Sequence, residues 1–324
     1  MQNNDNQKDL IGLVQSLKPK EKEPNSVRTL NAWIAHAEQK FGIAEGGRLS
    51  WLIATTIIIA KLQEVVDGQD QPKFLLKGGT LLQYRLGLET RATKDLDGLV
   101  CGDIDDFLVR LDERLAYSWG AVEFARGEIG RLKVPSKLVN PRWFEVTLSL
   151  RNKTWRKVRV EISPDEGGAG THSERLFGPT LTAFGIPSPH YLVSMAMSYQ
   201  IAQKIHAACS LHSPPEYRND RVRDLVDLVL LRRFADETGK PDSSEIALAI
   251  VDTFNTRANE ARQLGRRAIE WPMQITDKPG WRGDYTNLTK EVEVIITIDE
   301  AIDYVNEWLI KFSELTAEAE LQVS

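Results

Sequence analysis

Two short segments, Phe74–Thr80 and Arg91–Asp97, constrain the fold of this chain more than any other part of its sequence. The first predicts a buried strand that breaks at a diglycine and continues as a helix. The second predicts a strand, on which Asp95 and Asp97 point to one face while Leu96 faces the core, because side chains two residues apart share a face. The object that two such carboxylates would most simply hold is a divalent metal ion.

The 324 residues, 42% of them hydrophobic, allow one large core or two smaller ones. The longest apolar run, Leu52–Ala60, is far shorter than the roughly 20 residues of a membrane span, and the polar N-terminus has no apolar signal core. We therefore expect a soluble, cytoplasmic protein that does not contact the membrane. Cys101 and Cys209 have no metal-ligand spacing and are expected to be small buried residues.

Charge is unevenly distributed along the chain, although the net charge is only −5. Between Arg126 and Arg159 there are 10 Lys or Arg residues against 2 acids, whereas from Leu288 to Ser324 there are 9 acids and 2 lysines. The basic stretch is either a solvated face or the electrostatic footprint of a polyanion.

The hydrophobic period changes from two to 3.6 near residues 180–190, which predicts a domain boundary. We expect a polar leader over 1–24, an α/β (α+β) domain with a mixed sheet over 25–185 and a helical C-terminal domain over 186–324. The expected helices cover 26–42, capped by Ser26 and ended by Gly42, and then 48–66, 104–115, 191–210, 220–234, 244–267 and 299–318. A β-hairpin is expected around the turn 151–154, with Glu161 on the face opposite Val160 and Ile162.

The diglycine and the carboxylates together suit a nucleoside triphosphate. The carboxylates would hold Mg²⁺, the open turn would cradle the phosphates, and Thr80 could add a hydroxyl group at the helix start. A two-metal displacement usually needs a third carboxylate, for which Glu161 is the best candidate. The alternative is that Glu161 is a strand residue paired with Arg159 or Lys157.

A second cluster of charged residues interrupts the apolar helices of the C-terminal half. Lys204 could neutralise charge on a leaving pyrophosphate, and Asp224, which lies three residues from Asp227 on one helix face, could orient it. The alternative is an interhelical salt bridge between Lys204 and Asp224 without a catalytic role. We expect His206 to be a packing or hydrogen-bonding residue.

Several common motifs are absent from the sequence, including the Walker phosphate loop, the dinucleotide-binding glycine motif, the zinc-protease motif and the nucleophile elbow. Gly167–Gly170 is expected to be a flexible loop.

The sequence resembles the AbiEii/AbiGii-type nucleotidyltransferases, which are toxins of type IV toxin–antitoxin and phage abortive-infection systems within the DNA polymerase beta superfamily. The blocks that carry the resemblance are Leu76–Leu82, Arg91–Asp97, Gln203–Ala207 and Arg221–Leu228, with a softer match at Pro279–Tyr285. One departure is Gly98, where the family tends to have a larger apolar residue.

The resemblance implies a polymerase beta-like nucleotidyltransferase domain and assigns roles to residues of the matching blocks. Gly79 and Thr80 would contact the triphosphate, Asp95 and Asp97 would bind Mg²⁺, and Lys204 and Asp224 would complete the active site in a cleft between the domains. The full nucleotide-binding set would be Lys77, Gly78, Gly79, Thr80, Arg91 and Lys204, and Glu161 would be the third carboxylate of a site with two Mg²⁺ ions.

The function that follows is the transfer of a nucleoside monophosphate from an NTP to an acceptor. The resemblance implies that the acceptor is RNA, the 3′ end of tRNA, and that an antitoxin encoded nearby opposes the toxin. The basic residues expected to touch RNA are Arg151, Lys153, Arg156, Lys157 and Arg159. Two alternatives stay open: a transferase acting on a small molecule or a protein, and a non-catalytic subunit that binds a partner through its acidic C-terminal helix.

Overall fold

The computed structural model describes residues 10–42, 47–87, 90, 93–135, 137–210, 219–290, 292 and 294–323. The chain forms two compact units. The first contains the described residues up to Val134, together with Val139–Asp165 and Ser173–Ser194. The second contains those of Pro135–Leu138, Glu166–His172 and the chain from Met195 onward. Two short segments that lie between stretches of the first unit thus belong to the second.

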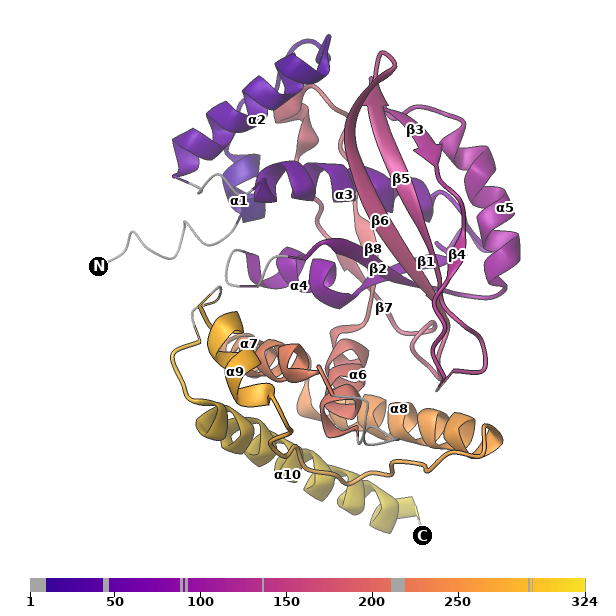
Figure 1. Ribbon diagram of the computed structural model, residues 1–324, viewed down its shortest axis with the longest axis vertical. Coiled ribbons are helices and arrows are strands. Elements are labelled where there is room, and N and C mark those ends of the chain that lie inside the picture. Colours follow the sequence, from indigo (N-terminus) through magenta and orange to yellow (C-terminus); the bar gives the residue numbers. More distant parts are fainter. Residues whose placement is uncertain are drawn as a thin grey trace. The chain divides into compact units, whose positions relative to one another are not determined.

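The first unit is built on one mixed sheet, as expected for its fold class, and Figure 1 shows its strands as arrows. The strand order is β3-β5-β6-β2-β1-β8-β7, and β4 pairs with β5. β2 is antiparallel to β1 and parallel to β6, so it is central to the sheet. The bounds are β1 Phe74–Lys77, β2 Asp95–Val100, β3 Glu123–Arg126, β4 Gly130–Arg131, β5 Arg142–Leu150, β6 Lys153–Pro164, β7 Ser173–Leu176 and β8 Leu192–Met195.

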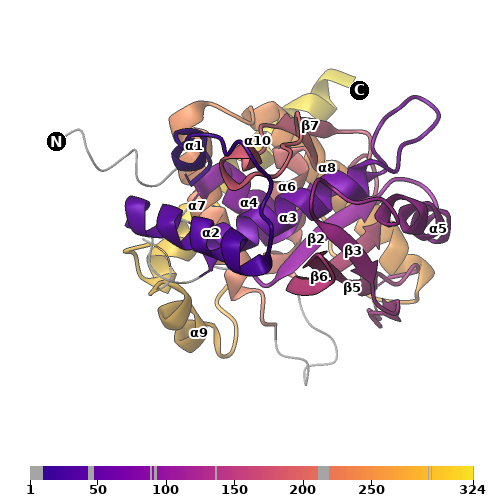
Figure 2. The ribbon, with the colours of Figure 1, turned by 90° about the horizontal axis from the view of Figure 1, so that it is seen from above.

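Helices cover one face of this sheet and bury its apolar side chains. α3 is buried along nearly its whole length, as its apolar sequence predicts, and crosses behind the β5–β6 hairpin in Figure 1. α2 lies beside α3 in Figure 2; Ser26 caps its start and Gly42, with φ 64°, ends it, as expected. The helices of this unit are α1 Leu10–Gln15, α2 Val27–Phe41, α3 Arg48–Gln63, α4 Gly78–Leu86 and α5 Ile104–Leu115, with a short 3₁₀ turn at Leu181–Phe184.

The expected β-hairpin is formed by β5 and β6, and its turn consists of Arg151 and Asn152. Both turn residues have positive φ, 48° and 61°, which is the backbone that a two-residue hairpin needs. Along β6, Val158, Val160 and Ile162 are buried under the helices. The residues between them therefore line the opposite, open face of the sheet.

The segment 191–210 is not one helix, contrary to the sequence prediction. Its first part is β8, which pairs in parallel with β1, and α6 begins only at Met197. The side chain of Gln63 extends this pairing, because its amide donates to the carbonyl of Val193 at 2.6 Å and accepts from the Val193 N–H at 3.0 Å. A four-residue buried strand has no periodicity of its own, so only pairing with β1 identifies it.

The second unit is helical, as expected. α6 packs against α7 and α8, and α10 packs against both of these helices. Its elements are α6 Met197–Cys209, α7 Val222–Thr238, α8 Ser243–Gln263, α9 Trp281–Leu288 and α10 Ile298–Val323. Among the described residues of the whole chain, we find no helix that combines the length and apolarity needed to cross a lipid bilayer.

Candidate active site

The diglycine turn lies directly against one of the two carboxylates. β1 ends at Lys77, α4 begins at Gly78, and Lys77 is paired across the strands with Asp97. Gly78 has φ +71°, and a Cβ atom at this position would lie 2.3 Å from Oδ2 of Asp97. Only glycine allows the backbone of the turn to approach the carboxylate this closely.

The two carboxylates share one side of β2, as the sequence predicts. Leu96 is fully buried between them, whereas Asp95 and Asp97 lie on the open face of the sheet. The parallel register of β2 and β6 places Glu161 directly beside Asp97. Lys77, Asp97 and Glu161 therefore form a row across three neighbouring strands.

Glu161 is engaged by an arginine of its own strand. The Nε atom of Arg159 lies 2.8 Å from Oε1 of Glu161 and 3.8 Å from Oδ1 of Asp95. Within the described parts of the chain, no group of three or more His, Cys, Asp or Glu residues is arranged to hold a metal ion. Asp95 and Asp97 still fit one Mg²⁺ ion, because this ion commonly takes one or two carboxylates and fills its remaining positions with phosphate and water.

The remaining residues expected to bind nucleotide have different surroundings. Lys77 Nζ donates to Oγ of Ser163 at 2.6 Å, on the same face as Asp97. Thr80 is fully buried, and its hydroxyl group donates to the backbone carbonyl of Asp95 at 3.1 Å, which ties the start of α4 to β2. Gly79 is buried in the first turn of α4, and Arg91 lies outside the described residues.

Packing against Phe74 explains why position 98 is a glycine in this chain. A Cβ atom there would lie 2.1 Å from the ring of Phe74, which is fully buried on the neighbouring strand β1. The Phe74 ring thus fills the space that a larger residue at position 98 would take.

In the helical unit, Lys204 is held between two carboxylates. Its Nζ donates to Asp224 at 2.8 Å and to Asp227 at 2.7 Å, and all three residues are buried. Burial alone would lower the pKa of Lys204, but the two carboxylates outweigh it and raise the pKa above its usual value. The lysine is therefore charged, and Asp227, which the sequence did not single out as a site residue, shares it with Asp224.

Burial is the main influence on His206 and the two cysteines. His206 packs edge-on against Phe254 with 4.8 Å between ring centroids, and burial, followed by the nearby Arg257, strongly lowers its pKa. Cys209 is buried, as expected, whereas Cys101 is only half-buried. Burial raises the pKa of Cys101 to about 11, so neither residue shows the thiolate character of a nucleophile or metal ligand.

The five basic residues expected to touch RNA do not share one surface. Arg151 and Lys153 are exposed at the hairpin turn, and Lys157 and Arg159 lie on the open face of the sheet. Arg156 points to the helix-covered face instead, where it donates to Ser50 and lies over the ring of Trp51. A β-bulge between Leu148 and Ser149 shifts the pairing just before Arg156.

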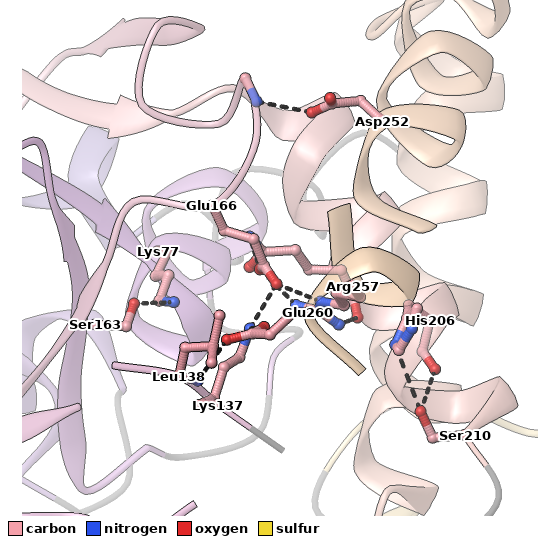
Figure 3. A network of polar contacts seen from close by, with 12 residues as sticks. Lys77, Lys137, Leu138, Ser163, Glu166, His206, Ser210, Asp252, Arg257 and Glu260 are labelled. Atoms are coloured by element: carbon pink, nitrogen blue, oxygen red, sulfur yellow. Dashed lines mark hydrogen bonds and ion pairs between the residues drawn. The ribbon is translucent and has the colours of Figure 1, made fainter. Parts of the chain in front are cut away.

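The structure also reveals a buried ion network that the sequence analysis missed. Glu166 accepts a bidentate pair from Arg257 at 2.7 and 2.8 Å and lies 2.6 Å from Lys137, which also contacts Glu260 at 3.0 Å. Figure 3 shows these side chains converging on Glu166. Burial would raise the pKa of Glu166, but the two cations hold it well below its usual range. The network anchors the segments 135–138 and 166–172 to α8.

Gly167–Gly170 is a turn outside the helices and strands, as expected for a loop, and it is held by contacts with the helical unit. The Gly168 N–H donates to Asp252 at 2.7 Å, and Tyr199 donates to the same carboxylate at 3.1 Å. A Cβ atom on Gly167 would lie 2.5 Å from Asp252, and one on Gly168 would lie 2.4 Å from the Tyr199 hydroxyl. These glycines thus permit close packing. The residues that could have indicated this packing, Asp252 and Tyr199, are distant in the sequence.

The mixed sheet carries a glycine turn after β1 and two same-face carboxylates on the adjoining strand β2, an arrangement that suits a nucleotidyl-transferring enzyme. The family model described as "Nucleotidyl transferase AbiEii toxin, Type IV TA system" matches residues 61–303, which is well over half of the chain. The chain therefore belongs to this family, and the resemblance carried by its motifs is confirmed. It is a nucleotidyltransferase toxin of a type IV toxin–antitoxin system, a family that implies an NTP substrate and an antitoxin partner.

The comparison with curated proteins finds no match. Among solved structures, the chain is similar to MenT4, a nucleotidyltransferase toxin from Mycobacterium tuberculosis H37Rv. The two share 16% sequence identity with a TM-score of 0.47, over 89% of this chain and 99% of the other.

Proposed function

We propose that this toxin transfers a nucleoside monophosphate from an NTP to the 3′ end of an RNA, with tRNA as the acceptor, in a reaction that depends on Mg²⁺ and releases pyrophosphate. The observation that carries the proposal is the contact between the glycine turn and Asp97. A Cβ atom on Gly78 would lie 2.3 Å from this carboxylate, so a phosphate bound at the turn lies beside it.

Asp95 and Asp97 are the proposed metal ligands. A bound Mg²⁺ ion would bridge phosphate oxygens and neutralise charge that develops on them. Thr80 contributes indirectly, because its bond to the Asp95 carbonyl fixes the helix start relative to the strand. The N–H groups in the first turn of α4 can donate hydrogen bonds to phosphate oxygens, since the first N–H groups of a helix have no intrahelical partner.

Lys204 and Asp224 are proposed as the contribution of the helical unit to the same reaction. Their support is the buried contact among Lys204, Asp224 and Asp227, which keeps the lysine charged. A charged lysine can stabilise negative charge on a leaving pyrophosphate, whereas a neutral one cannot.

The acceptor is proposed to be RNA because basic residues extend along the hairpin from its exposed turn to the open face beside the carboxylates. Arg151 and Lys153 lie at the turn, and Lys157 and Arg159 follow on β6. Binding through phosphates predicts an affinity that falls steeply with salt concentration.

The test is incubation of the purified full-length chain with each radiolabelled NTP, Mg²⁺ and total tRNA. We expect label on RNA, and its loss in Asp95→Ala and Asp97→Ala. Glu145→Ala is a matched control, because Glu145 is an exposed carboxylate on the same open face, paired only with Lys157 at 3.9 Å among the described residues. Label transfer that survives both aspartate variants would refute the metal site.

Other outcomes separate the remaining alternatives. Label on a protein or a small molecule, but not on RNA, would replace the acceptor and leave the donor site in place. Absence of metal-dependent NTP binding by calorimetry would favour a binding subunit without catalytic activity.

A further inference from the structure

Beside the carboxylates, Arg159 is stacked on the indole of Trp143. The guanidinium carbon lies 4.3 Å from the ring centroid. Trp143 on β5 is paired with Glu161 on β6, and both belong to the open face of the sheet. A Cβ atom on Gly130 would lie 2.2 Å from the indole nitrogen, so the backbone of β4 packs directly on this ring. The tryptophan is therefore a rigid support for the arginine.

The guanidinium is anchored mainly through one of its nitrogens. Nε of Arg159 donates to Glu161 at 2.8 Å and lies 3.8 Å from Asp95. Among the described residues, neither terminal nitrogen of Arg159 donates a hydrogen bond to another group, and the side chain is 37% exposed. An arginine that is fixed at one edge, and whose terminal nitrogens donate to no described residue, has the geometry of a fork for a phosphate group.

The sheet order places this fork away from the glycine turn. β2 carries Asp95 and Asp97, with β1 and the turn on one side and β6 with Arg159 on the other. If the donor triphosphate lies at the turn, Arg159 lies on the opposite flank of the two carboxylates. A phosphate held there is assigned to the acceptor, because Arg159 lies on the flank of β2 that faces away from the turn.

We propose that Arg159 binds a backbone phosphate near the reacting end of the acceptor RNA, and that Trp143 and Glu161 are the residues that position it. Glu161 is then the anchor of Arg159 and not a metal ligand. This inference rests on the proposed function, which supplies the acceptor, but it concerns a contact that can be measured without turnover.

The other basic residues of the hairpin do not meet these conditions. Arg156 lies on the helix-covered face, and Lys157 is 60% exposed with only a distant carboxylate, that of Glu145, as its partner in the described part of the chain. Arg151 and Lys153 lie at the turn, outside the pairing of β6 with β2. Arg159 is thus the one of the five that the sheet register places next to Asp95.

The first measurement is the affinity of the full-length chain for fluorescent single-stranded RNA, by anisotropy over a range of salt concentrations, without NTP or metal. Arg159→Ala should weaken binding about tenfold and reduce the slope of log K against log salt by about 0.7, the value for one phosphate contact on a single strand. Arg159→Lys keeps the charge but loses the fork and the stacking, so it should lose about threefold. Trp143→Ala should lose about as much RNA affinity as Arg159→Lys. If Trp143→Ala does not fold, Arg159→Ala alone tests the proposal.

Arg175→Ala is the matched control. Arg175 also stacks on an aromatic ring, that of Tyr191 at 4.5 Å, but lies on the edge strand β7. The Arg175→Ala variant loses the same charge as Arg159→Ala and should bind RNA with wild-type affinity. RNA binding by Arg159→Ala that equals that of the Arg175→Ala control would overturn the proposal, as would a wild-type chain that binds no RNA.

The second measurement separates an anchor from a metal ligand. Calorimetry with Mn²⁺ and an α,β-methylene nucleoside triphosphate should show that Glu161→Gln binds within about twofold of wild type, whereas Asp97→Asn binds far more weakly. In the RNA assay, Glu161→Gln should weaken binding, and the double variant with Arg159→Ala should be no weaker than Arg159→Ala alone, since one residue acts through the other. Metal binding by Glu161→Gln that is as weak as that of Asp97→Asn would overturn the assignment.

These arms also separate failure of the inference from failure of the proposed function. An Arg159-dependent RNA affinity without any nucleotide transfer to RNA would uphold the phosphate site and reject the proposed acceptor reaction. Transfer to RNA that is unchanged in both affinity and rate by Arg159→Ala would uphold the reaction and reject the site.

Discussion

Replacement of Gly78 by alanine tests how closely the glycine turn must approach the carboxylate. The added Cβ atom would lie 2.3 Å from Oδ2 and 2.8 Å from Cβ of Asp97, whereas ordinary contacts begin near 3.4 Å. The turn or the aspartate must therefore move by about 1 Å. A displacement of this size at a reacting centre costs about a hundredfold in rate, which corresponds to about 2.7 kcal/mol of activation free energy.

The same substitution also carries a backbone cost, which has to be measured separately. Gly78 has φ +71°, and a residue with a side chain in this region costs about 1–2 kcal/mol. Gly42→Ala is the matched control, because Gly42 has φ +64° but no atom within 4 Å of the added Cβ. Both variants should lose similar stability from strain, and only Gly78→Ala should lose activity.

The assay compares initial rates of label transfer at saturating Mg²⁺ and NTP with the free energy of unfolding in urea. Transfer by Gly78→Ala within about threefold of the Gly42→Ala rate would refute the reasoning, because a displacement of about 1 Å in the turn or in Asp97 would then have no kinetic consequence. A large loss of activity in Gly42→Ala would show that strain alone is responsible.

Two further predictions concern stability. Glu166→Gln should lower the free energy of unfolding at pH 7 by about 3 kcal/mol, because Arg257 and Lys137 lose a buried partner. The folded-state pKa of Glu166 lies below its ordinary 4.5, so this stabilisation is present above pH 4.5 and is lost as the pH falls. Urea titrations should therefore show a smaller difference in the free energy of unfolding between variant and wild type at acidic than at neutral pH. An equal difference at both pH values would contradict the prediction. Gly98→Ala should destabilise the chain by about 1–3 kcal/mol, since its Cβ would lie 2.1 Å from the Phe74 ring. Phe74→Leu in the same chain should recover part of this loss, and strictly additive effects in thermal unfolding would argue against the contact.

Much of the fold follows from local patterns in the sequence. The burial of Leu96 between Asp95 and Asp97, and the position of Glu161 opposite Val160 and Ile162, agree with the alternation of strand residues. The capped helix after Ser26 agrees with its helical period and its terminal glycine. These features need only neighbouring residues, so one sequence is enough to predict them.

Other features depend on partners that are distant in the chain. β8 was expected to be helical, and its pairing with β1 decides otherwise. The close packing of Gly167 and Gly168 depends on Asp252 of α8 and Tyr199 of α6, which are distant in the chain. In each case the local sequence permits two conformations, and a contact made across the fold selects one of them.

The candidate site divides in the same way. The sequence predicts which residues can carry the chemistry, because a diglycine turn and two carboxylates at strand spacing are local signals. The face of Arg156 follows from the same local alternation, because Arg156 lies two residues before the buried Val158. Contacts made across the fold place Arg159 between Glu161 and Asp95 and Lys204 between two aspartates. Strand register and helix packing set the neighbours of Arg159 and Lys204, and neither can be read from residues that are adjacent in the chain.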